Sequence, residues 1–106
     1  MIISKNFSDF KKIINNIEKR NMLLSGANWF QRYQLWIYSN EQVVIENDKI
    51  IIPFVSGKHN YNAVFIRNIK TNEIVIQNSI IGSVWWYFLN RLISKRILKN
   101  WNKCIE

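Results

Sequence analysis

A series of β-rich runs joined by very short connections is the strongest constraint on the fold of this chain. The runs are rich in aromatic and β-branched residues and occupy residues 29–38, 42–46, 49–55, 62–69 and 73–77. Parallel neighbours need a long crossover between them, which these connections do not provide. Consecutive runs are therefore expected to pair as an antiparallel meander.

Two of the connections have the composition of tight turns. Asn47 and Asp48 separate the second and third runs, and both residue types tolerate a positive φ, so a hairpin is expected there. A second hairpin is expected around residues 70–72. Pro53 has no amide hydrogen to donate, so we expect the third run to lie at a sheet edge or to stop near this residue.

Helical segments flank the strand region on both sides. Ser8 is a good N-cap, and apolar residues recur at helical spacing over residues 8–23, up to a C-capping Gly26. A long C-terminal helix is expected after residues 78–79, which can cap it. The predicted fold is one α+β domain spanning residues 1–106. It has an N-terminal helix, an antiparallel meander of about five strands and a long C-terminal helix packed on one sheet face.

The net charge of +8 is concentrated near the two ends of the chain. Residues 1–24 carry five Lys and Arg against two acids, residues 25–77 five against four, and residues 78–106 five against one. Such an excess favours a polyanionic partner, although it can also simply keep an aromatic-rich protein soluble. Ile and Asn are over-used while Ala occurs only twice, which is typical of A+T-rich coding sequences and points to a virus (a phage included), a mobile element or an A+T-rich microbe.

The sequence contains little that supports catalysis or binds a cofactor. His59 is the one histidine and lies in a polar connection, and Cys104 is the one cysteine, so neither pairs with a second ligand at metal-binding spacing. We therefore expect a non-enzymatic protein with no metal and no cofactor. A single thiol and the lack of a secretory or membrane-spanning segment predict a cytoplasmic protein, in the host cytoplasm if the source is viral.

The C-terminal segment carries the clearest functional pattern, a row of cations at four-residue spacing. A helix brings such residues to one side, where they can contact phosphates, and Trp101 would stack on a base if it is exposed. The predicted nucleic-acid-binding residues are Arg91, Lys95, Arg96, Lys99, Trp101 and Lys103. The basic surface would extend over Lys11, Lys12, Lys19 and Arg20 if the two helices lie side by side. The alternative is that these cations only oppose the dipole at the helix end and keep the helix soluble.

Aromatic residues form a second candidate surface. Trp85 and Trp86 belong to a segment that is apolar nearly all round, which requires burial on more than one side or contact with a second chain. Trp36 and Tyr38 share one side of a predicted strand, where they could face a partner. These four residues are the predicted partner interface.

Two functional hypotheses follow from these surfaces. The first is a small accessory protein of a phage, virus or mobile element that binds nucleic acid or a nucleoprotein through its basic helix. The alternative is a protein–protein effector, such as an inhibitor of a host enzyme or defence complex, or an oligomerising structural protein, acting through the aromatic surface. Attachment to a membrane is disfavoured, because a sheet-containing domain more simply uses the apolar helix face as core.

Overall fold

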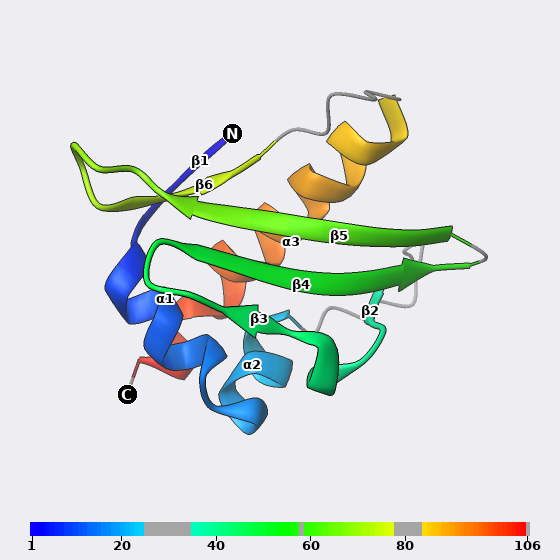
Figure 1. Ribbon diagram of the computed structural model, residues 1–106, viewed down its shortest axis with the longest axis horizontal. Helices are drawn as coiled ribbons and strands as arrows, with labels where there is room; N and C mark the ends of the chain where they lie inside the picture. Colours follow the sequence, from blue (N-terminus) through cyan, green and yellow to red (C-terminus); the bar gives the residue numbers. More distant parts are fainter. Residues whose placement is uncertain (25–34, 58, 78–83, 106) are drawn as a thin grey trace.

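The computed structural model describes residues 1–24, 35–57, 59–77 and 84–105, except for the side chains of residues 59 and 84–86. Within these ranges the chain forms six strands, three α-helices and one short 3-10 helix (Figure 1). In chain order they are β1 (Ile2–Asn6), α1 (Phe7–Ile14), α2 (Ile17–Leu24), β2 (Trp36–Ile37), η1 (Asn40–Gln42), β3 (Val44–Ile45), β4 (Lys49–Ser56), β5 (His59–Arg67), β6 (Glu73–Ile76) and α3 (Val84–Cys104).

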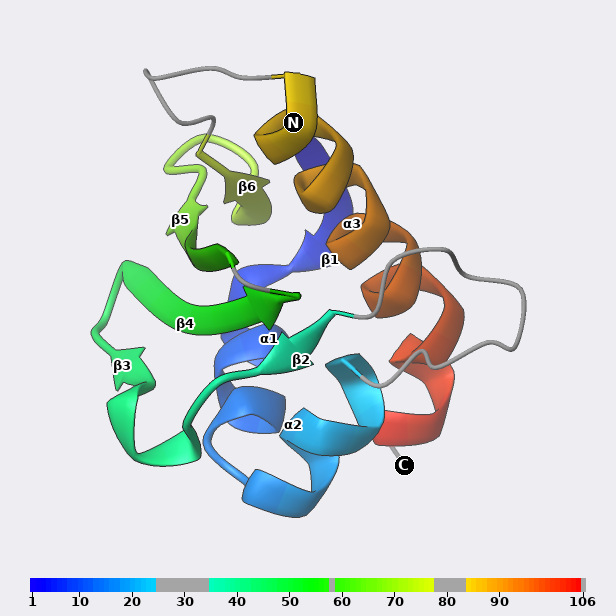
Figure 2. The same ribbon diagram turned by 90° about the vertical axis from the view of Figure 1, so that its right-hand side faces the viewer.

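All the strands in the described ranges belong to one antiparallel sheet, which confirms the predicted α+β fold. The strand order is β1-β6-β5-β4-β2, and β3 also pairs with β4. The sheet curls like half of a barrel, and α3 packs against its inner face (Figure 2). Strand β1 was not predicted from the sequence. It pairs with β6, so a strand from the start of the chain completes the edge of the sheet.

The two predicted hairpins are confirmed, and a third is present. β3 pairs with β4 across the turn that contains Asn47, and β5 pairs with β6 across a turn in which Asn72 has a φ of 58°. The third hairpin joins β4 and β5, and Ser56 lies opposite His59 in their register. Gly57 supports this hairpin with a φ of 59°, a conformation that residues with a Cβ rarely adopt.

The prediction that Pro53 places its strand at a sheet edge is wrong. β4 is a central strand, paired with β5 along its whole length and with β2 and β3 on its other side. The Pro53 carbonyl accepts a hydrogen bond of 2.7 Å from the Tyr38 amide, and the N and C=O of a strand residue point to the same neighbour. The missing amide hydrogen therefore faces the junction between β2 and β3, and no β4–β5 bond is lost.

The single predicted N-terminal helix is instead two short helices, α1 and α2. Asn16 caps α2, because its Oδ1 accepts a hydrogen bond of 3.1 Å from the Lys19 amide. The N-cap of α1 is Asn6 and not Ser8, because Asn6 Oδ1 accepts from the Asp9 amide at 3.1 Å. Asn side chains compete with the helical hydrogen bonds of the backbone, which explains both boundaries. Most of the first predicted strand and the caps predicted for α3 lie outside the described residues.

The apolar core lies between the inner face of the sheet and the helices. The ring of Phe10 in α1 packs against that of Phe65 in β5, with the ring centroids 4.9 Å apart. α3 contributes one side of its length, namely Leu89, Ile93, Ile97 and Trp101. Because this side of α3 is committed to the core, its other side is left for solvent or for a partner.

Candidate nucleic-acid interface

The solvent-facing side of α3 carries a row of cations. Four of the predicted binding residues are exposed and lie on this side: Arg91, Lys95, Lys99 and Lys103. We call these four residues the α3 row. Since an α-helix rises about 1.5 Å per residue, successive members are about 6 Å apart along the axis and the row is about 18 Å long.

The charges of the α3 row repel one another, and none of them is in an ion pair within the described part of the chain. The sequence of α3 contains no acidic residue, and within the described residues the ion pair that is present joins Arg67 and Asp48 instead. Like charges four residues apart on a helix destabilise it by about 0.2–0.5 kcal/mol per pair. The favourable effect of the helix dipole is confined to the last turn, which contains Lys103 alone among the four. A favourable interaction with the helix dipole therefore accounts for the presence of Lys103 but not for the other three cations of the row.

Two of the predicted contact residues lie inside the protein and do not belong to the interface. Arg96 is 5% exposed, and its Nη1 donates hydrogen bonds to the carbonyls of Leu24 at 3.3 Å and Leu35 at 2.7 Å. Burial lowers the pKa of its guanidinium. Trp101 is 4% exposed, and the Lys5 ammonium lies 5.9 Å from its ring centroid, so it does not offer a surface to a base.

Lysines of α1 and α2 continue the basic surface past the end of α3. Lys12 and Lys19 line a pocket together with Cys104 and Ile105, and we call it the C-terminal pocket. The Cys104 thiol donates to the Lys19 carbonyl at 3.6 Å. Burial raises the pKa of this thiol, and the positive charges of Lys19 and Lys103 partly oppose that rise. α2 and α3 are thus neighbours, as the extension of the basic surface required.

Not every cation of the first two helices takes part in this surface. Arg20 is buried, and its Nε donates a hydrogen bond of 2.8 Å to the Ile14 carbonyl. Its Nη1 donates to Asn40 Oδ1 at 3.1 Å, which ties α2 to η1. Arg20 therefore connects elements of the fold, and the burial lowers the pKa of its guanidinium.

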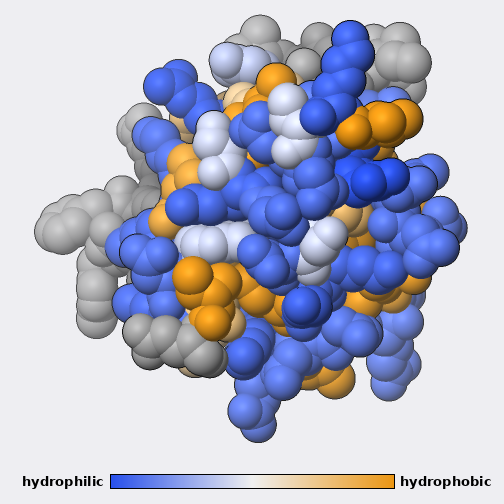
Figure 3. Space-filling view, turned by 90° about the vertical axis from the view of Figure 1, so that its left-hand side faces the viewer, coloured by the Kyte–Doolittle hydropathy of each residue, from blue (hydrophilic) through white to orange (hydrophobic). Residues whose placement is uncertain are grey.

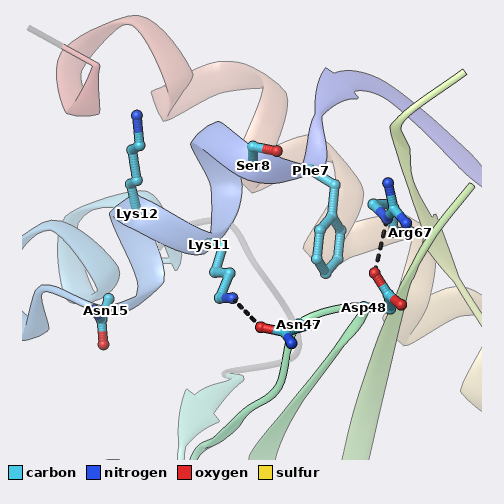
Figure 4. A pocket seen from close by; sticks show the side chains of 8 residues that line it. All are labelled: Phe7, Ser8, Lys11, Lys12, Asn15, Asn47, Asp48 and Arg67. Carbon is cyan, nitrogen blue, oxygen red and sulfur yellow. Dashed lines mark hydrogen bonds and ion pairs between the residues drawn. The ribbon is translucent and has the colours of Figure 1, made fainter.

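A second pocket, of about 480 Å³, lies between α1 and the β3–β4 turn (Figure 4). We call it the lateral pocket. On one wall Lys11 Nζ donates to Asn47 Oδ1 at 3.1 Å, and on the other Arg67 Nε donates to Asp48 Oδ1 at 2.8 Å. Lys12 also lines this pocket, and Figure 4 shows it extending from α1 in a different direction from Lys11. The described lining of this pocket thus contains three cations and one carboxylate.

The aromatic residues predicted as a partner interface are only partly described. Trp36 and Tyr38 are 51% and 57% exposed. Trp36 lies opposite Val55 in the register, on the face of the sheet that points away from the core. The side chains of Trp85 and Trp86 lie outside the described residues.

The face around Trp36 is apolar over several strands, and we call it the outer sheet face. None of the helices in the described ranges covers it (Figure 1). Its apolar residues are Ile51, Val55, Val64, Ile66 and Val75, all partly buried, and Ile2, Trp36, Tyr38 and Val44, all exposed.

No protein-family model matches the chain, and no curated protein or solved structure shows significant similarity to it. Of the helices in the described part of the chain, none combines the length and the apolar character of a membrane-spanning segment. Likewise, the described side chains include no group of three His, Cys, Asp or Glu residues placed to hold a metal ion. The function is therefore inferred from the surface of this protein alone.

Proposed function

We propose that this protein is a small non-enzymatic accessory protein that binds nucleic acid, free or in a nucleoprotein, through the α3 row. The observation that supports the proposal is the uncompensated repulsion within the row. Three of its four cations gain nothing from the helix end, and no acid on α3 balances them. A chain of phosphates relieves this repulsion, because each phosphate contacts a cation and releases condensed counterions.

The number of cations sets the expected dependence of binding on salt. Each neutralised phosphate contributes about 0.9 to the slope of log K against log salt for duplex DNA and about 0.7 for a single strand. The four cations of the row alone therefore contribute about 3.6 and 2.8 to these slopes, respectively. A fourfold rise in salt concentration would weaken duplex binding by roughly 150-fold.

A titration of binding against salt tests the proposal. The variant K95Q/K99Q removes the two central members of the row, and K49Q/K70Q removes two exposed lysines from β4 and the β5–β6 turn as a matched control. Fluorescence anisotropy with labelled single- and double-stranded oligonucleotides should show the slope falling by about 1.4 to 1.8 for the row variant alone. An absence of binding at low salt overturns the proposal. An equal fall of the salt slope in both variants shows that only the net charge matters, and it overturns the assignment of the binding site to α3.

The proposal includes a cytoplasmic location and a phage, viral or mobile-element origin. The location is supported by the single unpaired thiol, Cys104, because free thiols are more typical of a reducing compartment. The origin is supported by the A+T-rich residue usage of the chain. Wild-type protein isolated without reductant should therefore retain one titratable thiol per chain after unfolding.

Self-association through the outer sheet face is a second candidate function. The described part of this face carries only three charged residues, Glu46, Lys49 and Glu73, although the chain carries +8 overall. Two copies packed face to face would keep their α3 rows on opposite sides of the dimer, where like charges repel least. Light scattering over a range of concentrations should show a dimer for the wild type and a monomer for W36S/Y38S. A wild-type monomer at the highest concentration overturns this candidate.

A further inference from the structure

The basic surface extends from the last turn of α3 to the lateral pocket. Lys103 and Lys19 both lie close enough to Cys104 for their charges to act on its thiol. Lys19 and Lys12 line the same C-terminal pocket, and Lys12 also lines the lateral pocket with Lys11. Lys19 and Lys12, which lie in these linings, thus link the end of the α3 row to the lateral pocket.

Among the described residues, two carboxylates line the pockets of this path, one in each pocket. Asp9 lines the C-terminal pocket, where Lys12 and Lys19 outnumber it. Asp48 lines the lateral pocket and is already held by Arg67 at 2.8 Å. The described lining of each pocket therefore carries more positive than negative charge, which favours an anionic ligand.

The path bends around one end of the molecule. α3 lies on the inner side of the sheet, and α1 stands between the end of α3 and the β3–β4 turn (Figures 1 and 2). Figure 3 looks onto the side of the protein where α1 and the C-terminus lie, and its described surface is predominantly hydrophilic. A ligand that follows the cations must therefore change direction within a protein that measures only 33 × 30 × 25 Å.

We infer that the nucleic acid bound by this protein is single-stranded, with its backbone running along the α3 row, past Lys19 and Lys12, and into the lateral pocket. This inference rests on the proposed function. A duplex has a persistence length of about 50 nm and stays straight over the size of this protein, so it can follow the α3 row but not the bend. A single strand bends at each nucleotide, and its phosphates can reach all the cations of the path. Lys11 and Arg67 are placed to receive the phosphates at the end of the path.

The test compares three labelled probes at low salt: a long single strand of about 20 nucleotides, a short one of about 6, and a duplex of the longer length. The variant K12Q/K19Q removes the two cations at the bend, and K49Q/K70Q again serves as the control with the same change in charge. Thermal unfolding of each variant shows that the fold is kept. R67Q provides an independent change at the end of the path.

The long single strand should bind at least about tenfold more tightly than the duplex. K12Q/K19Q should weaken the long single strand by roughly one to two orders of magnitude at about 50 mM salt and lower its salt slope by about 1.4, while affecting the duplex no more than the control does. R67Q should weaken only the long single strand. Equal affinities for the long single strand and the duplex overturn the inference, and so does a K12Q/K19Q variant that binds like the control. In either case the proposed function is still tested separately by K95Q/K99Q, which changes only the α3 row. A failure of all three probes to bind overturns the proposed function as well.

Discussion

The variant K95Q/K99Q should be more stable than the wild type although it loses two surface charges. The α3 row contains three like-charge pairs at four-residue spacing, and replacing Lys95 and Lys99 removes all three. At about 0.2–0.5 kcal/mol per pair, the free energy of unfolding should rise by about 0.6–1.5 kcal/mol. Gln and Lys have similar helix propensities, and Lys103 remains in the last turn, so neither propensity nor the helix dipole reverses this gain.

Urea unfolding followed by circular dichroism measures the effect, and thermal unfolding provides a second readout. A gain of 1 kcal/mol raises the Tm of a domain of about 100 residues by about 4–8 °C. The gain should shrink in about 1 M salt, where the Debye length falls to about 3 Å, because the repulsion is between exposed charges. The control K49Q/K70Q shows how much of the gain comes from lowering the net charge alone.

Two results would refute the reasoning. If K95Q/K99Q loses stability, the cations of the row contribute to the fold, and their spacing is not a sign of function. If the gain is unchanged at high salt or equal to that of the control, repulsion within the row is not its source. In the expected case, the same two lysines lower stability and raise affinity, which is typical of residues kept for binding.

Four further predictions concern two buried side chains, a turn and the thiol. Phe65→Ala should lower the free energy of unfolding by about 3–5 kcal/mol in urea titrations, because the ring is fully buried in the core. Tyr61→Phe should lower it by about 1–2 kcal/mol, because the buried hydroxyl donates to Asn90 Oδ1 and the mutation leaves that oxygen without this donor; an unchanged midpoint would mean that the bond contributes nothing. Gly57→Ala should lower it by about 1–2 kcal/mol, entirely from the positive φ, since a Cβ there would meet nothing within 4 Å. The Cys104 thiol should react with a disulfide reagent far more slowly in the native than in the unfolded protein at neutral pH, because it is buried and burial raises its pKa; equal rates would contradict the buried position.

The parts of the fold predicted correctly are those with local signals. Asn47 and Asp48 favour a turn through their own backbone preferences, independently of distant residues. Short connections force neighbouring runs into antiparallel pairs. β1 has no such signal, because its partner β6 lies about 70 residues away and only the folded sheet brings the two together. The position of Pro53 depended on the gap between β2 and β3, which is again a property of the assembled sheet.

The candidate site was also predicted only in part, because some of its features have a local signal in the sequence and others arise only in the folded protein. Spacing alone identified the exposed cations of the α3 row, but it gave no reason to separate Arg96 from them. The signal that could have done so is its position between Ile93 and Ile97, at the border of the buried side of the helix. The lateral pocket could not be predicted, because Lys11 and Asn47 meet only after α1 has packed against the β3–β4 turn.

The pairing of β1 with β6 sets the earliest point in synthesis at which the sheet of this protein can be completed. At about 5–20 residues per second, a ribosome takes about 4–14 s to proceed from β1 to the residues of β6. During that interval Ile2 and Ile3 belong to a strand without its partner, and the helix that closes the core is made later still. A nascent chain stopped before Glu73 lacks β6, which joins β1 to the rest of the sheet, and it also lacks α3. Such a fragment exposes apolar strands to chaperones and proteases, so the intact protein should accumulate in cells and its C-terminal truncations should not.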